Sequence, residues 1–205
     1  MSTPAQVVTM AAELRRALGA GATLMIDVGY LFNDLPTAAR VAQQLEAYDI
    51  AFFETPFPVD YPPLYAELAR RTRLPLAMGE HGVTRWEFQE MAERGGVQVL
   101  QPYANTCGGL TEAKRIVEWA RERGCQVCPG NWSTQILGAA NLHLAAWSAI
   151  TPFIEFAPAE VYASPLRQAL QEAGHPVQRG AITWPTTPGI GYHLPEAILQ
   201  RFRLG

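Results

Sequence analysis

Lysine and cysteine are scarce in this chain of 205 residues, and each scarcity excludes a class of chemistry. Of the 16 lysine and arginine residues, only Lys114 is a lysine, so a lysine base or Schiff-base mechanism inside this chain would have to use it. The three cysteines are too few, and odd in number, for a disulfide scaffold. Cys125 and Cys128 lie three apart on a short predicted strand, where they face opposite sides and cannot clamp zinc together. We interpret the cysteines as buried free thiols.

Blocks of positive charge and long apolar runs are missing as well. The net charge is −3 at pH 7, and no basic block could neutralise phosphates, which argues against nucleic acid as a partner. No apolar run reaches the ~18 residues of a membrane helix, and the N-terminal residues do not form a signal peptide. Apolar residues make up 48% and charged residues 17%, a globular composition. We expect a soluble, cytoplasmic protein that binds neither nucleic acid nor a membrane.

Short apolar runs alternate with stretches of helical period along most of the chain. The runs that predict strands are Thr23–Ile26, Ile50–Phe53, Leu74–Met78, Val97–Leu100, Cys125–Cys128 and Pro152–Ile154. The stretches that predict helices are Pro4–Leu18, Thr37–Ala47, Pro62–Arg71, Thr84–Arg94, Thr111–Arg123, Ser133–Ser148 and Pro195–Phe202. Strands that alternate with helices indicate βαβ units and a parallel sheet. Continuous apolar runs are typical of strands buried on both faces.

The regular spacing of these units predicts an α/β fold, a (β/α) barrel of the TIM type. A Rossmann-type sheet would need a glycine-rich turn after the first strand, and the sequence has none there. A full barrel takes about 250 residues and eight strands, so a chain with six predicted strands looks two strands short at its N-terminus. We predict one domain, with βα units over residues 1–155 and a Pro/Gly-rich tail with a last helix over residues 156–205.

Three acids follow three consecutive predicted strands: Asp27, Glu54 and, after Gly79, Glu80. In a parallel barrel, side chains just past the strand ends point into the mouth of the active site, so three negative charges would share one mouth. No lysine or arginine lies in these segments to offset their repulsion, whereas a divalent cation that prefers hard oxygen ligands would. Each acid alone could be a helix N-cap or a solvated loop residue. The three in register predict a Mg²⁺ site.

Several longer motifs occur in one order along the chain. They are LMIDV, FFETPFP, LAMGEH, LQPYANTCGGLTEAKRI, LHLAA, FIEF and PGIG. As a set, they resemble the mandelate racemase and muconate lactonizing enzyme branch of the enolase superfamily over essentially the whole chain. The resemblance implies a modified barrel that follows an N-terminal capping domain. It also implies Mg²⁺ ligands at positions that match Asp27, Glu54 and Glu80, and removal of a proton next to a carboxylate to give an enediolate stabilised on the metal.

The chain departs from this family pattern in four places. The strand with the family's Lys-x-Lys acid/base pair would precede Asp27 and is missing, as is the capping domain. Tyr103 stands in place of the Asp of the family's Gln-Pro-Asp, and Gly130 in place of the His that pairs with it. Gly29 replaces an Asn two residues after the first ligand. An imidazole without its orienting carboxylate loses its tautomer and basicity, so the loss of both members indicates a relocated or a lost mechanism.

Three residues are candidates for catalysis at the mouth. Glu155 matches a family acid that hydrogen-bonds the substrate carboxylate, and the alternative is a solvated acid at a strand end. Tyr103 could donate a proton, or its ring could only fill the space that the dyad leaves. His81, next to Glu80, could be a replacement base or a loop histidine. We interpret His143, on a predicted helix, as a structural residue.

Two main hypotheses follow. The first is a Mg²⁺-dependent lyase or isomerase that acts on a small carboxylic acid, with dehydration of a hydroxy or sugar acid favoured because it is common among relatives; the residues do not distinguish it from racemisation or cycloisomerisation. The second is a truncated or non-catalytic barrel that keeps the metal site and lacks acid/base residues. A weaker third is a ligand-binding module without turnover. Because an open barrel exposes strand edges, we expect a homo-oligomer or a need for a missing N-terminal segment.

Overall fold

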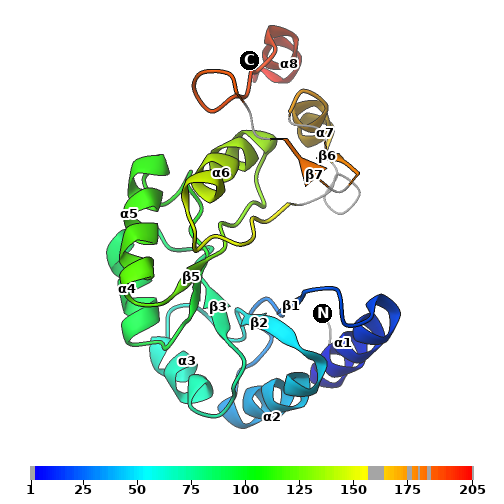
Figure 1. The fold of residues 1–205 in the computed structure, drawn as a ribbon, viewed down its shortest axis with the longest axis vertical. Coiled ribbons are helices and arrows are strands. Elements are labelled where there is room, and N and C mark those ends of the chain that lie inside the picture. Colours follow the sequence, from blue (N-terminus) through cyan, green and yellow to red (C-terminus); the bar gives the residue numbers. More distant parts are fainter. Residues whose placement is uncertain (1–2, 157–163, 175–176, 180, 184–185, 205) are drawn as a thin grey trace.

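A parallel sheet forms the centre of the computed structural model of the chain, which describes residues 3–156, 164–174, 177–179, 181–183 and 186–204. Its strands are β1 (Leu24–Asp27), β2 (Ile50–Glu54), β3 (Leu76–Met78), β4 (Val99–Leu100) and β5 (Gln126–Val127). They are hydrogen-bonded in chain order, each parallel to the next. This sheet, with a helical crossover after each strand, is the wall of a (β/α) barrel and confirms the predicted fold class. Within the described residues the wall does not close (Figure 1).

Helices cover the outer side of this wall (Figure 1). They are α1 (Pro4–Leu18), α2 (Leu35–Leu45), α3 (Pro62–Ala69), α4 (Arg85–Glu93), α5 (Gly109–Glu122) and α6 (Gln135–Trp147), with a 3₁₀ turn η1 (Glu46–Tyr48). Thr3, Asp34 and Thr84 are the N-caps of α1, α2 and α4, because each side chain accepts a hydrogen bond from a backbone N–H of the first turn. The prediction for α1 is confirmed residue for residue, and the others within a few residues.

The prediction of a sixth strand at Pro152–Ile154 is wrong, since these residues do not form a strand of the sheet. The chain around it nevertheless runs beside β5. Before the segment, the carbonyl of Ile150 accepts a bond from the N–H of Val127 at 2.9 Å; after it, the N–H of Glu155 donates to the carbonyl of Pro129 at 3.1 Å. Pro152 has no N–H to donate, so a regular ladder cannot continue through it.

The described part of the C-terminal tail contains more structure than we predicted. In addition to the expected last helix, α8 (Glu196–Phe202), it holds α7 (Pro165–Glu172) and a small antiparallel pair, β6 (Val177–Gln178) and β7 (Ala181–Ile182). Ser164 caps α7 in the same way that Thr3 caps α1. The rest of the tail lies outside the described residues.

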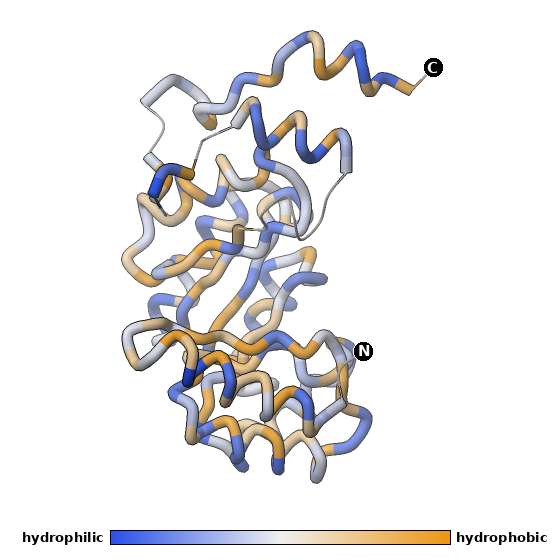
Figure 2. Tube along the Cα trace, turned by 90° about the vertical axis from the view of Figure 1, so that its right-hand side faces the viewer, coloured by the Kyte–Doolittle hydropathy of each residue, from blue (hydrophilic) through white to orange (hydrophobic). Residues whose placement is uncertain are grey.

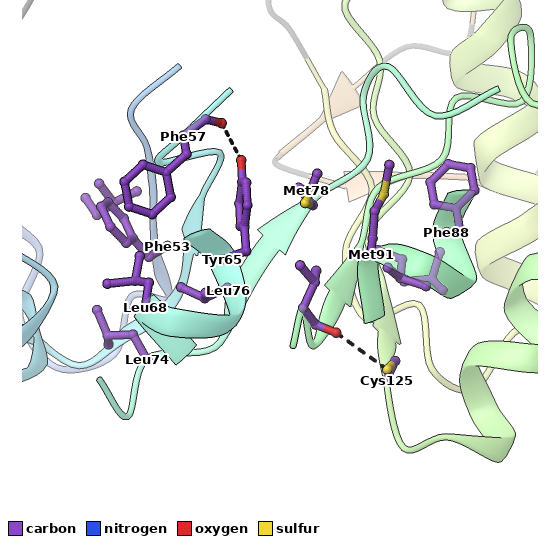
Figure 3. Close-up of a cluster of buried hydrophobic side chains, with 14 of the residues drawn as sticks. Phe53, Phe57, Tyr65, Leu68, Leu74, Leu76, Met78, Phe88, Met91 and Cys125 are labelled. Atoms are coloured by element: carbon purple, nitrogen blue, oxygen red, sulfur yellow. Dashed lines mark hydrogen bonds between the residues drawn. The ribbon is translucent and has the colours of Figure 1, made fainter. Parts of the chain in front are cut away.

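Apolar side chains bury both faces of the sheet. On the helix side, five fully buried side chains pack together, namely Phe53, Phe57, Tyr65, Leu68 and Leu76 (Figure 3). The Tyr65 hydroxyl donates a hydrogen bond to the carbonyl of Phe57. A smaller group covers the inner side, namely Phe52, Ala77, Val99 and Cys128. The helices carry both hydrophobic and hydrophilic residues along their length, as expected for helices with one face on a sheet (Figure 2).

Two further sequence predictions can be compared with the structure. Cys107, Cys125 and Cys128 are all buried and free, which confirms the interpretation as buried thiols. Among the described residues, no helix is both long and apolar enough to cross a membrane.

Candidate active site

Asp27 and Glu54 stand side by side at the carboxyl ends of β1 and β2, where they are register partners. Register partners on neighbouring strands share a face of the sheet, so the two side chains point to the same side. Glu80 follows β3 after Gly79, whose φ is 143°. A Cβ at Gly79 would lie 2.8 Å from the backbone nitrogen of Gln101, so the tight turn that brings Glu80 to this edge requires a glycine. The structure thus places the three predicted ligands at one edge of the sheet.

The carboxyl groups at this edge perturb one another. Burial raises the pKa of Asp27, and the charge of Glu80 raises it further, against a hydrogen bond from the N–H of Gly29 to Asp27 Oδ1 at 2.9 Å. Burial raises the pKa of Glu54 to about 8, and the charges of Asp27, Glu155 and Glu80 contribute. Buried carboxyls that repel one another are an arrangement that a divalent cation stabilises.

The fit of this cluster to a metal ion is good in donor type and incomplete in geometry. All three side chains offer carboxylate oxygens, the donors that Mg²⁺ prefers. Within the described ranges, however, no group of three or more His, Cys, Asp or Glu side chains already gathers closely enough to hold an ion. Binding would therefore require the side chains of Asp27, Glu54 and Glu80 to turn towards one another.

Tyr30 reaches this cluster from the loop after β1, and sequence reasoning did not identify it. Its hydroxyl donates to Glu80 Oε1, and its ring stacks on His81 with centroids 5.9 Å apart and 18° between the planes. His81 Nε2 lies 3.9 Å from the same Glu80 oxygen, and the His81 side chain is 63% exposed. Because the contact spans fifty positions of the chain, nothing local in the sequence signals it.

Tyr103 and Glu155 form a second group at the same end of the sheet. The Tyr103 hydroxyl donates to Glu155 Oε2 at 3.3 Å, the N–H of Asn131 donates to that oxygen, and the N–H of Trp132 donates to the Tyr103 oxygen. Burial raises the pKa of Tyr103, and the Glu155 charge adds to the effect, so the phenol keeps its proton. Burial also raises the pKa of Glu155, against the bonds from Asn131 and Tyr103 that lower it.

The ring of Tyr103 occupies the space that a side chain at position 130 would need. A Cβ built on Gly130 would lie 1.9 Å from Tyr103 Cε2, far inside van der Waals contact. The carbonyl of Gly130 accepts a bond from Asn141 Nδ2 at 3.1 Å, and Asn141 is fully buried in α6. The two departures at positions 103 and 130 are therefore coupled, because a large residue at the first requires a glycine at the second.

The predicted site residues thus fall into two neighbouring groups. Glu54 interacts electrostatically with both Glu80 and Glu155, which links the predicted metal ligands with the Tyr103–Glu155 pair. His81 lies beside the first group, through its contacts with Tyr30 and Glu80. His143 lies within α6, as predicted. The arrangement combines three carboxyl groups, whose oxygens are the donors that Mg²⁺ prefers, with a protonated phenol, and such groups are suited to proton transfer next to a carboxylate.

Known enzymes are similar to this chain in sequence. Arabinonate dehydratase of Saccharolobus solfataricus is 27% identical over 190 residues, and D-galactonate dehydratase of Ralstonia pickettii is 31% identical over 200 residues. These matches cover 93% and 94% of this chain but 50% and 51% of the relatives, so the chain spans about half their length.

Solved structures give the same result. A mandelate racemase/muconate lactonizing enzyme from Jannaschia sp. CCS1 superposes with a TM-score of 0.85 at 30% identity, over 97% of this chain and 50% of that one. The 3,6-anhydro-D-galactonate cycloisomerase from Zobellia galactanivorans also reaches 0.85, at 27% identity, over 97% of this chain and 55% of that one. The family model described as "Enolase C-terminal domain-like" matches residues 2–198. The chain therefore belongs to the enolase C-terminal domain-like family, in its mandelate racemase/muconate lactonizing enzyme branch.

Proposed function

We propose that this chain is the barrel part of a Mg²⁺-dependent enolase-superfamily enzyme that dehydrates a hydroxy or sugar acid through an enediolate. The observation that carries the proposal is the register pairing of Asp27 and Glu54 at the strand ends, with Glu80 near enough to raise the pKa of both. The sugar-acid dehydratases among the relatives favour dehydration. The cycloisomerase among the similar structures makes cycloisomerisation the main alternative reaction.

Asp27, Glu54 and Glu80 would hold the metal. A Mg²⁺ ion bound there supplies positive charge that stabilises the negative charge developing on the substrate carboxylate. For Glu54, whose pKa burial raises to about 8, binding as a carboxylate requires loss of a proton at neutral pH.

Tyr103 would act as the general acid. Burial raises its pKa, so at neutral pH the phenol is protonated and is available as a proton donor and not as a base. When the bond between carbon and the departing hydroxyl breaks, the Tyr103 hydroxyl gives its proton to that oxygen, which leaves as water. Glu155, 3.3 Å from the phenol oxygen, orients it and can return a proton to it. In its protonated form, which burial favours, Glu155 could also hydrogen-bond the substrate carboxylate.

The base that removes the proton next to the carboxylate would be His81 or a lysine on a strand outside this chain. His81 lies at the mouth, 3.9 Å from Glu80 and largely exposed, so a substrate can reach it. Its neighbour Tyr30 is tied to Glu80 as a hydrogen-bond donor and is not a candidate for this step.

The test is turnover of sugar acids such as D-galactonate and arabinonate with Mg²⁺, measured as formation of a 2-keto-3-deoxy acid. We expect product from the wild type and at least a hundredfold less from Tyr103→Phe, since general acid catalysis contributes about 10²–10⁴-fold. The phenylalanine keeps the ring that fills the space at Gly130. The matched control is Tyr61→Phe, because Tyr61 is 57% exposed on the loop before α3. Full activity of Tyr103→Phe would contradict the assignment of the acid.

A second candidate is a truncated or non-catalytic barrel that keeps the metal site and pairs with another copy or with an N-terminal segment. The unclosed wall and the match to half of each relative favour it. The turnover assay, together with thermal unfolding with and without Mg²⁺, separates the two. Stabilisation by Mg²⁺ without product from any sugar acid would favour the non-catalytic barrel, and neither stabilisation nor product would contradict both.

A further inference from the structure

Tyr30 forms a hydrogen bond with Glu80, and the proposed reaction gives Tyr30 no role in proton transfer. Its hydroxyl donates to Glu80 Oε1, although the two residues come from the loops after β1 and β3. His81 Nε2 lies 3.9 Å from the same oxygen. One oxygen of the Glu80 carboxylate is thus fixed by the protein, and fixing one oxygen sets the direction in which the other points.

The backbone of the loop holds Tyr30 in place. Its N–H donates to the carbonyl of Thr55 at 2.8 Å, so the loop after β1 is tied to the loop after β2. Its φ is +64°, in the left-handed region that residues with a Cβ other than Asn and Asp rarely adopt. Conformations of this kind persist only where surrounding contacts impose them. Here the contacts are the bond to Thr55, the bond to Glu80 and the stacking on His81.

The preceding residues hold Asp27 in a similar way. The N–H of Gly29, which has a φ of +46°, donates to Asp27 Oδ1 at 2.9 Å. The same short loop therefore contacts the acid at the end of its own strand and, through Tyr30, the acid two strands away. A loop that restrains two carboxylates of one cluster limits the directions in which each can turn, and so guides both towards a shared cation.

We propose that Tyr30 is a positioning residue that orients the Glu80 carboxylate for the divalent cation. The inference rests on the proposed metal site at Asp27, Glu54 and Glu80. Groups that hydrogen-bond to a ligand, without touching the metal, orient it, and their loss typically lowers metal affinity about 10–100-fold.

The experiment measures the thermal unfolding midpoint of the full chain over increasing Mg²⁺ concentrations, which gives an apparent affinity without any assay of activity. The variants are Tyr30→Phe, which keeps the ring and its stacking on His81, and the control Tyr61→Phe. We expect Tyr30→Phe to need 10–100-fold more Mg²⁺ for the same increase in midpoint, about the loss typical of such partners. Tyr61→Phe should match the wild type.

The possible outcomes separate this inference from the proposed function. An unchanged Mg²⁺ response in Tyr30→Phe, with a clear response in the wild type, overturns the role of Tyr30 and leaves the metal site in place. No response in the wild type overturns the metal site itself. If Tyr30→Phe does not unfold cooperatively, Tyr30→Asn decides, because asparagine adopts the left-handed backbone readily and lacks the hydroxyl. A normal Mg²⁺ response in Tyr30→Asn also overturns the inference.

Discussion

Replacing Gly130 by alanine tests the coupling between positions 103 and 130 most sharply. The added Cβ would stand 1.9 Å from Tyr103 Cε2, whereas ordinary contacts begin at 3.4 Å, so the ring has to move by 3.4 − 1.9 = 1.5 Å. Overpacking of this kind costs about 1–3 kcal/mol. Losing the bond between Tyr103 and Glu155 as the ring moves adds about 1 kcal/mol. We therefore expect Gly130→Ala to lower the free energy of unfolding by about 2–4 kcal/mol.

A double-mutant cycle in urea identifies the cause. In a Tyr103→Ala background the ring is gone, so Gly130→Ala should cost almost nothing. In a Tyr103→Phe background the ring stays, and the packing part of the cost should persist. Gly21→Ala is the matched control, because a Cβ there meets no atom within 4 Å. An equal cost of Gly130→Ala in the alanine and wild-type backgrounds would refute the coupling.

Three further predictions concern titration, hydrogen bonding and thiol reactivity. Because burial raises the pKa of Glu54 to about 8, the folded state holds its proton more tightly than the unfolded state, so without metal ions stability should fall between pH 4.5 and 8. Glu54→Gln should flatten that fall in urea titrations, and an unchanged slope would contradict the assignment. Asn141→Ala removes the bond to the Gly130 carbonyl and should cost about 1–3 kcal/mol in urea unfolding, whereas Asn105→Ala, the control at an exposed asparagine, should cost little. Burial raises the pKa of Cys107 to about 11 and of Cys128 to about 12, so both should react with a thiol reagent only on unfolding; fast reaction of the native chain would contradict their burial.

The positions of the strands and of the acids at their ends can be predicted from the sequence, because both depend on short stretches of neighbouring residues. The strands β1 to β5 lie where continuous apolar runs predict them, and Asp27 and Glu54 are register partners as their equal positions imply. The prediction fails at Pro152–Ile154, where a single proline interrupts the ladder beside β5. The helix α7 was not predicted, although Ser164 and Pro165 supply its N-cap and first turn.

The finer features of the site depend on distant parts of the chain. The bond from Tyr30 to Glu80 requires a left-handed tyrosine and a turn at Gly79, and only the assembled sheet brings the two loops together. The sequence shows that Tyr103 and Gly130 both depart from the family pattern. It does not show that the ring of Tyr103 fills the space beside Gly130, because that contact depends on how the loops after β4 and β5 pack together.

Calorimetric titration of the chain with Mg²⁺ tests the central claim, that Asp27, Glu54 and Glu80 form a metal site. We predict saturable binding by the wild type, with a heat that changes with the ionisation enthalpy of the buffer at pH 7, because Glu54 has a pKa of about 8 and must release its proton to bind. In Glu54→Gln we predict much weaker binding without proton release. Absence of binding by the folded wild type, or equal binding by Glu54→Gln, would contradict the account.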